Sequence, residues 1–269
     1  MENIANFEAL TVLLKALNMQ LQINQALATN TINYSTTSMK DIVLLHGLFG
    51  NLSNWKSVEQ ELSLNYQVWT PQLPLFNHFL GGGLSKLVDF LEDYLDKHQI
   101  KNPILIGNSL GGHVALLYTL KYPEKVERLV LTGSSGLYEN SFGGTFPRVK
   151  DYQYIKQKIE DVFDRKEVVD EEMVSYVFDI VQQKTKALSV IMLARDAQKQ
   201  NLKELLHFIK IPVLLIWGLQ DIVTPPEVAE EFYQHLPNAT LHYIDRCGHA
   251  PMMEQPELFN GYVSNFLAS

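Results

Sequence analysis

Short runs of apolar residues recur along the chain, separated by longer stretches in which apolar positions return every three to four residues. The runs are apolar on both faces, which is typical of strands in a mostly parallel sheet, because helices cover both sides of such a sheet. From residue 40 onward the predicted strands are 42–45, 68–69, 103–106, 129–131, 213–217 and 241–244.

The longer stretches have the spacing that places apolar side chains along one face of a helix. They lie between the predicted strands and cover residues 84–98, 110–122, 226–236 and 256–268. Strands that alternate with helices in this way predict an α/β fold, in which a doubly wound, mostly parallel sheet is flanked by helices.

One region interrupts the alternation. Between Leu137 and about Leu206 the sequence has no strand pattern, but it has helical patterns over 151–163, 170–183 and 185–198. We expect this block to be a helical insertion between two core strands, where it would lie over the carboxyl ends of the strands as a lid.

The N-terminal residues 1–18 are predicted to form a helical extension, with Phe7, Leu10, Leu13, Leu14 and Leu17 on one face. That face is expected to pack either on the body of the protein or on a partner subunit, so a homo-oligomer is one arrangement that the pattern allows. The next residues, 20–25 and 31–36, predict an antiparallel pair of strands.

The charge balance limits the partners. The chain of 269 residues carries 22 basic and 30 acidic side chains, a net charge of −8, whereas nucleic acids and anionic membranes need clustered Lys and Arg. We therefore predict a small-molecule substrate and neither of those partners. The single Cys247, the lack of a long apolar run and the lack of a basic N-terminal signal region predict a soluble, cytoplasmic protein.

The strongest chemical signal is the sequence GNSLGG at residues 107–112. It contains G-x-S-x-G between a predicted buried strand and a predicted helix, a tight turn that exposes the serine hydroxyl while its glycines avoid clashes. The helix that begins near Leu110 would present free backbone N–H groups to an oxyanion. We predict that Ser109 is a nucleophile rather than an incidental residue of a glycine-rich turn.

A serine hydroxyl needs a base, usually histidine, to take its proton. Of the eight histidines, His249 is favoured because it follows the last predicted strand and so lies at the same sheet edge as Ser109. His113, one turn into the helix, is expected to face away, and His46 is interpreted as structural. No histidine pair has the spacing of metal ligands, so we predict neither a metal nor another cofactor.

The third member of such a site is a carboxylate that orients the imidazole. Asp221 follows the predicted strand 213–217 and faces the same edge. Asp245, four residues before His249, is the competitor, but it is expected to end its own strand. The predicted order along the chain is Ser109, Asp221 and His249.

These pieces resemble the α/β-hydrolase superfamily over nearly all of residues 20–269. Beyond the three candidates, the matching parts are HGL at 46–48, WGLQD at 217–221 and GH at 248–249. The resemblance implies that the backbone N–H groups of Leu48 and Leu110 form an oxyanion hole. It also implies a helical cap over residues 137–205, with the α/β-hydrolase core in residues 19–136 and 206–269.

Within that superfamily, the nucleophile motif, Asn54-Trp55 and RCGH at 246–249 are similar to the carbon–carbon bond hydrolases of aromatic meta-cleavage pathways. This similarity implies that Asn54 and Asn108 bind substrate. That group usually has Trp after the catalytic histidine, where this chain has Ala250.

The sequence therefore predicts a serine hydrolase that cleaves a carboxylic ester or lactone of an apolar or weakly polar acyl compound through an acyl-enzyme. Hydrolysis of a carbon–carbon bond in a vinylogous diketone acid is the alternative. A non-catalytic protein that uses the same pocket to bind a ligand is a third hypothesis.

Overall fold

The computed structural model describes residues 39–50, 52–76, 83–140 and 148–269. The predicted N-terminal helix over 1–18 and the predicted strand pair over 20–25 and 31–36 lie outside the described residues. All elements below belong to the unit Met39–Ser269.

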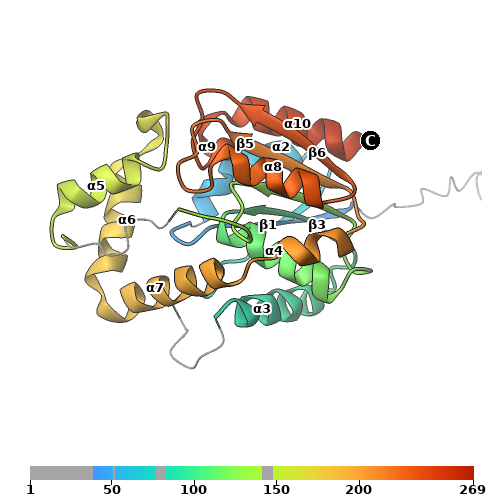
Figure 1. Ribbon diagram of the computed structural model, residues 1–269, viewed down its shortest axis with the longest axis horizontal. Coiled ribbons are helices and arrows are strands. Elements are labelled where there is room, and N and C mark those ends of the chain that lie inside the picture. Colours follow the sequence, from blue (N-terminus) through green and yellow to red (C-terminus); the bar gives the residue numbers. More distant parts are fainter. Residues whose placement is uncertain (1–38, 51, 77–82, 141–147) are drawn as a thin grey trace, which may run out of the picture. The chain divides into compact units, whose positions relative to one another are not determined.

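The described residues form a sheet of six strands in which each strand runs parallel to its neighbours (Figure 1). Its order is β2-β1-β3-β4-β5-β6. The sheet confirms the predicted fold class, and each strand end lies within two residues of its predicted position. The strands are β1 (Asp41–Leu45), β2 (Gln67–Trp69), β3 (Ile104–Asn108), β4 (Arg128–Thr132), β5 (Val213–Gly218) and β6 (Ala239–Ile244).

The strand order changes direction between β1 and β3. From β1 the chain moves outward to β2, then returns to the other side of β1 and continues through β3 to β6. In such sheets ligands bind beyond the carboxyl ends of the strands at this switch point. Leu45 of β1 pairs with Gly107 of β3, so the loops that follow the two strands begin side by side.

Helices cover both faces of the sheet, as expected for a doubly wound fold. Each strand alternates its side chains between two apolar clusters, so that in β1 Val43 and Leu45 lie in one cluster, while Ile42 and Leu44 lie in the other. The first face is covered by α3 (Gly83–Lys97), α4 (Leu110–Lys121) and α8 (Pro226–His235), and the second by α2 (Lys56–Leu62), α9 (Pro251–Glu254) and α10 (Pro256–Ala268) (Figure 1).

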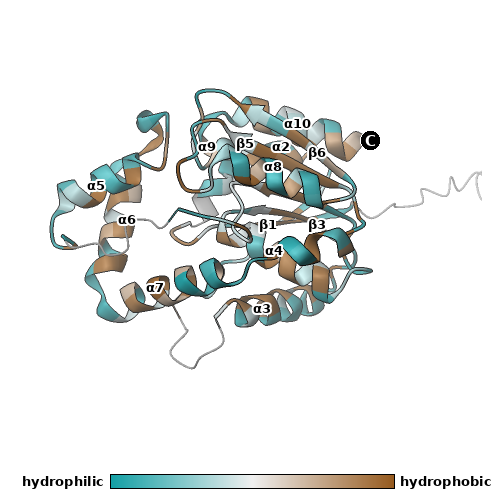
Figure 2. Cartoon of the chain, in the orientation of Figure 1, coloured by the Kyte–Doolittle hydropathy of each residue, from teal (hydrophilic) through white to brown (hydrophobic). Residues whose placement is uncertain are grey.

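This double burial explains why the strands read as continuous apolar runs. Figure 2 shows the sheet mostly brown between helices whose outward surfaces are mostly teal. Full burial of one large aliphatic side chain is worth about 1.5–3 kcal/mol relative to exposure. The central strands β3 and β5 are buried along their whole length and therefore form a firm base for the loops at their ends.

A helical segment joins β4 to β5. It comprises α5 (Tyr152–Glu160), α6 (Glu171–Gln182) and α7 (Lys184–Lys199), with short 3₁₀ turns at Lys166–Val168 and Lys203–Phe208, and another 3₁₀ turn, Leu52–Trp55, precedes α2. Asp151 and Asp170 cap α5 and α6 by accepting the backbone N–H groups of Tyr154 and Met173. A small apolar cluster holds these two helices together: Ile155, Ile159, Val174, Val177 and Val181.

The helical segment is attached to the core through α7. Leu193 and Ala197 of α7 belong to the apolar cluster on the α3 face of the sheet. The Asp196 carboxylate accepts the backbone N–H of Leu84 at 2.7 Å, so a residue of α7 caps the first turn of α3.

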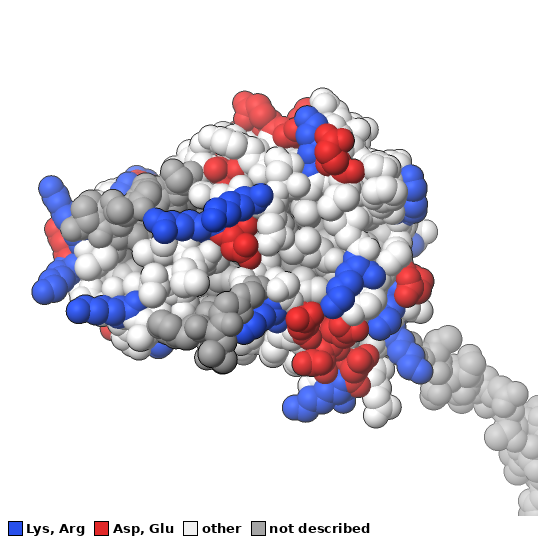
Figure 3. Space-filling model, turned by 60° about the horizontal axis from the view of Figure 1, so that its bottom comes forward, with Lys and Arg blue, Asp and Glu red and all other residues white. Residues whose placement is uncertain are grey.

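Charged side chains of both signs are interspersed on the face shown in Figure 3. Several exposed ion pairs join the described residues, and one of them links Lys121 to Asp89 at 3.0 Å and to Glu92 at 3.4 Å. Exposed pairs of this kind are worth about 0–1 kcal/mol. Within the described ranges, no helix combines the length and the apolar character that a bilayer crossing requires.

His113 on α4 is fully buried. Neither ring nitrogen has a hydrogen-bond partner among the described residues. Burial lowers the pKa of His113 from 6.5 to about 4, against the opposing charge of Asp196. The folded protein thus holds this imidazole neutral, whereas the unfolded chain would bind a proton below pH 6.5.

Acid should therefore destabilise the protein through His113. Because the pKa of His113 is about 4 in the folded state and 6.5 in the unfolded chain, the fall in pH from 6.5 to 4 removes on the order of 3 kcal/mol of unfolding free energy. His113→Leu should flatten this part of the pH dependence. Urea unfolding at pH 7 and pH 4.5 checks it, with the exposed His207→Gln as control. Equal losses of stability in wild type and His113→Leu would contradict the expectation.

Candidate active site

Ser109 lies on the turn between β3 and α4, with φ of 53° and ψ of −121°. A positive φ is strained for a residue with a side chain and typically costs about 1–3 kcal/mol. The turn is so tight that only glycines fit at positions 107 and 111, on either side of Ser109. A Cβ on Gly107 would lie 2.6 Å from the carbonyl oxygen of Gly111, and one on Gly111 would overlap the carbonyl of Leu45. The structure thus has the strand-turn-helix context that the motif predicts.

Neighbouring backbone fixes this turn. The N–H of Ser109 donates to the carbonyl of Thr132 at 3.1 Å, and its carbonyl accepts the N–H of Ser135 at 3.1 Å. The buried Asn108 side chain donates to the carbonyls of Thr132 and His249, each at 3.0 Å. Asn108 therefore connects the strand that carries Ser109 to the loop that carries His249, although the two residues are far apart in sequence.

The loop after β1 passes against Ser109. A Cβ on Gly47 would lie 3.1 Å from the Ser109 Cβ. Leu48, a predicted oxyanion donor, follows directly. The other, Leu110, is the first residue of α4, and its N–H has no acceptor within the helix. Leu48 lies on the loop after β1 and Leu110 begins α4 directly after Ser109, and their role as oxyanion donors stays a prediction.

His46 has a structural environment. Its Nε2 accepts the backbone N–H of Leu73 at 3.0 Å and contacts the Gln72 side-chain nitrogen at 3.0 Å. Its Nδ1 then carries the proton and donates to the carbonyl of Gly47 at 2.9 Å. Burial lowers the pKa of His46, so the ring stays neutral and ties the Leu73 loop to the loop after β1.

The loops after β5 and β6 meet through Asp221 and His249. The His249 Nδ1 and an Asp221 carboxylate oxygen are 2.8 Å apart, and the two residues are 8% and 3% exposed. Asp221 also accepts the backbone N–H groups of Val223 and Thr224 at 2.8 and 3.0 Å, and the Thr224 hydroxyl at 2.9 Å. These bonds fix the carboxylate in the orientation that receives the imidazole.

The pKa of His249 is raised. Burial acts against protonation, but the charge and hydrogen bond of Asp221, together with the charges of Glu139 and Glu254, outweigh it. His249 can accept a proton only when it is neutral, that is, above this raised pKa. An activity that used His249 as a base would therefore decline as the pH falls through it.

The competing carboxylate points elsewhere. Asp245 is exposed and accepts the side-chain N–H of Gln220 at 3.0 Å. The other side-chain atom of Gln220, its oxygen, accepts the backbone N–H of Cys247 at 3.0 Å. The structure thus brings Asp221, and not Asp245, to His249.

The two residues expected to bind substrate have protein contacts. Both amide hydrogens of Asn108 are used by backbone carbonyls, which gives it a scaffold role in this structure. The Asn54 side chain donates to the Met253 sulfur at 3.3 Å, among its interactions. Contact with substrate stays a prediction for both.

Sequence reasoning missed two carboxylates near His249. Glu139 accepts the hydroxyl of Ser135 at 2.8 Å, and burial raises its pKa. The next residue, Asn140, donates its N–H to the carbonyl of Val223 at 2.7 Å, which fastens this segment to the Asp221 loop. Glu254 is 1% exposed. Neither stands in a motif that predicts a role at the site, and the contacts that tie their segments to it come from Val223 and from Asp164 and Arg165, which are distant in sequence.

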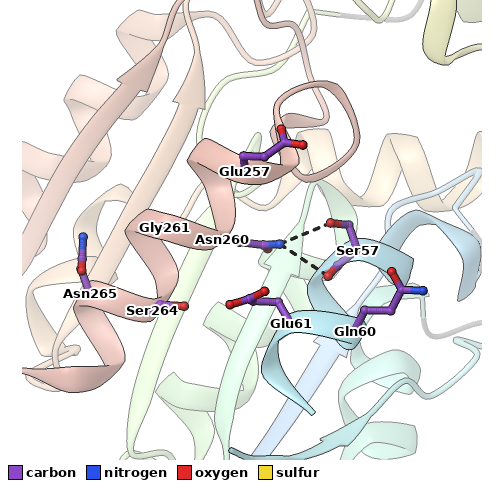
Figure 4. A pocket seen from close by; sticks show the side chains of 8 residues that line it. All are labelled: Ser57, Gln60, Glu61, Glu257, Asn260, Gly261, Ser264 and Asn265. Carbon is purple, nitrogen blue, oxygen red and sulfur yellow. Dashed lines mark hydrogen bonds between the residues drawn. The ribbon is translucent and has the colours of Figure 1, made fainter. Parts of the chain in front are cut away.

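A surface groove lies between α2 and α10 (Figure 4), where the Asn260 side chain donates to the Ser57 carbonyl at 3.4 Å. None of its lining residues is a predicted site residue: Ser57, Gln60, Glu61, Glu257, Asn260, Gly261, Ser264 and Asn265. Among the described residues, no group of three or more His, Cys, Asp and Glu side chains is placed to hold a metal ion.

The chain is similar to hydrolases of different specificities. It is 29% identical to a 2-hydroxy-6-oxo-2,4-heptadienoate hydrolase of Pseudomonas putida, over 85% of this chain and 89% of the relative. It is 27% identical to the monoacylglycerol lipase ABHD6 of Mus musculus, over 85% of this chain and 75% of the relative.

A solved structure supports the same grouping. It is MGS-MChE2, an α/β hydrolase enzyme from a sediment metagenome of the Mar Chica lagoon, with 37% identity and a TM-score of 0.70, over 86% of this chain and 91% of that one. The model of the α/β hydrolase family matches residues 42–261. The chain therefore belongs to the α/β hydrolase family.

Proposed function

We propose that this α/β hydrolase is a serine hydrolase that cleaves a carboxylic ester or lactone through an acyl-enzyme. The observation that carries the proposal is the 2.8 Å contact between His249 and Asp221 at the sheet edge where Ser109 occupies a strained turn. Asp221 engages Nδ1 and leaves Nε2 of His249 as the nitrogen that accepts the serine proton.

The proposed reaction has two halves. The Ser109 oxygen attacks the ester carbonyl carbon while His249 takes the hydroxyl proton, and the N–H groups of Leu48 and Leu110 stabilise the oxyanion. His249 then gives that proton to the leaving alkoxide, and the acyl group stays on Ser109. In the second half His249 deprotonates a water molecule, which attacks the acyl carbon and releases the acid.

The helical segment is an argument for an apolar substrate. We propose that the helical segment between β4 and β5, predicted as residues 137–205, forms a cap on the α/β core. The cap would exclude water from the carbonyl, and its apolar cluster around Ile155 and Val174 would give it a firm packing base. A small molecule with an apolar or weakly polar acyl group fits such a site.

The relatives include hydrolases of two kinds of bond, an ester and a carbon–carbon bond, so the bond that this chain cleaves has to be argued separately. The similarity to the heptadienoate hydrolase favours carbon–carbon cleavage as the second candidate. Two features favour an ester. Ala250 stands where meta-cleavage hydrolases usually have Trp. Arg195 of α7 is a cation that could pair with a dienoate carboxylate, but its side chain is exposed and so is not held in a buried substrate pocket.

Removal of the nucleophile tests the reaction class. Ser109→Ala should lower the turnover of short-chain p-nitrophenyl esters by on the order of 10⁴-fold or more, because no acyl-enzyme can form. A fluorophosphonate should label the wild type at Ser109, as found by peptide mass spectrometry, and should not label the variant. Exposed Ser63→Ala is the control.

The outcome also separates the other hypotheses. Loss of the visible absorbance of a meta-cleavage product, faster than any ester turnover, would move the assignment to carbon–carbon hydrolysis. A folded wild type that is not labelled and that turns over neither substrate would contradict the enzyme mechanism and support a ligand-binding protein.

The identity of the acid can be tested with a matched pair. Asp221→Asn should lower kcat by on the order of 10⁴-fold, because the amide cannot stabilise the imidazolium. The acid limb of the residual kcat/KM profile should move to lower pH, since Asp221 is what mainly raises the pKa of His249. Asp245→Asn should stay within about twofold of wild type. The reverse pattern would assign the role to Asp245.

A further inference from the structure

Glu254, at the end of α9, is a buried carboxylate five residues after His249. One oxygen accepts the backbone N–H of Gly248 at 2.9 Å and is 3.5 Å from that of Ala250, the two residues that flank His249. The other oxygen accepts the backbone N–H groups of Asp164 and Arg165 at 2.9 and 3.0 Å. One side chain thus bonds two separate backbone segments.

The second segment belongs to the helical insertion. Asp164 and Arg165 follow α5, about 90 residues before Glu254 in the chain. Two more hydrogen bonds join the same two backbone segments. The N–H of His249 itself donates to the carbonyl of Val162 at 3.1 Å, and the Arg165 guanidinium donates to the carbonyl of Glu254 at 2.8 Å.

The contact between the His249 loop and residues 162–165 after α5, called the junction below, has little free volume. A Cβ on Gly248 would lie 2.6 Å from the Val162 carbonyl oxygen and 2.9 Å from the Asp164 nitrogen. The backbone beside His249 therefore cannot shift without moving the segment after α5. The carboxylate between them transmits such a shift, because its two oxygens are fixed to opposite sides.

We propose that Glu254 is a positioning residue that fastens the helical insertion to the His249 loop, so that the placement of the insertion and the alignment of the imidazole are coupled. The inference rests on the proposed function. If Glu254 were only a local cap of the His249 loop, the bonds to Gly248 and Ala250 would suffice. The pair of bonds to Asp164 and Arg165 is what links it to the insertion.

The electrostatics of the junction give an independent readout. The charge of Glu254 contributes to the raised pKa of His249, together with Asp221 and Glu139. Burial raises the pKa of Glu254 itself, against the four N–H groups that favour its anion. Asp164 and Arg165 also lie at this contact, Glu167 pairs with the Arg165 guanidinium at 3.1 Å, and the buried Cys247 thiol lies near Asp164 and Arg165.

Glu254→Gln is the decisive variant because it conserves shape. One end of the amide can still accept, but its NH₂ group meets two N–H donors, so one of the two segments loses its bonds. We expect kcat to fall about 10- to 100-fold with KM changed less, as for a misaligned catalytic group. The pKa of His249, measured from histidine ¹⁵N shifts assigned with His249→Gln, should decrease.

Glu257→Gln is the matched control, because it removes the same charge from an exposed position three residues later. It should leave kcat within about twofold and the pKa of His249 unchanged. Arg165→Met is a second variant that leaves the carboxylate in place and removes the guanidinium bond to the Glu254 carbonyl, together with the guanidinium contacts to Gln255 and Glu167. It should lower kcat in the same direction but less, even if Glu254→Gln does not fold.

The NMR titration needs no turnover, so it separates this inference from the proposed function. If fluorophosphonate did not label the wild type, the proposed function would be contradicted. The comparison of the His249 pKa between wild type and Glu254→Gln would still test the inference about Glu254. A folded Glu254→Gln with wild-type kcat and an unchanged His249 pKa would overturn the inference. So would an Arg165→Met variant with unchanged kcat where Glu254→Gln fails to fold.

Discussion

Parallel pairing of β1, β3, β4, β5 and β6 is the constraint on which the site depends. The carboxyl ends of parallel strands lie at one edge of the sheet, so the loops that follow them meet there. Gly47 in the first of these loops and His249 in the last are more than 200 positions apart in the chain. The pairing of Leu45 with Gly107 places the loop after β1 beside Ser109. The tie from Asn108 to the His249 carbonyl then joins the third loop to the same point.

The regular elements could be predicted, and the three candidate residues could be named, because the signals for both are local. Continuous apolar runs such as 213–217 arise from burial on both faces, and Gly107 is required by contacts with Gly111 and Gly112 within the turn itself. The short helix α9 left no such signal, because its four residues are too few to show a period.

What could not be predicted is the network of bonds that ties distant segments of the chain to one another. The Glu254 bonds to Asp164 and Arg165, the Asn108 bond to His249 and the Asp196 cap of α3 each join segments separated by about 90 residues or more. Any of many carboxylates or amides in the chain could have filled these roles. Only the folded arrangement of loops decides which side chain meets an unpaired N–H group or carbonyl.

The site is costly to fold, and the core must offset that cost. Ser109 at positive φ and the buried carboxylates of Asp221 and Glu254 each oppose folding. Each cost is limited by neighbours that a less ordered loop would lack: hydrogen bonds to Asp221 and Glu254, and buried strands beneath Ser109. Preorganised donors and acceptors at a rigid sheet edge are what electrostatic catalysis requires, because groups already in place need no reorganisation during the reaction.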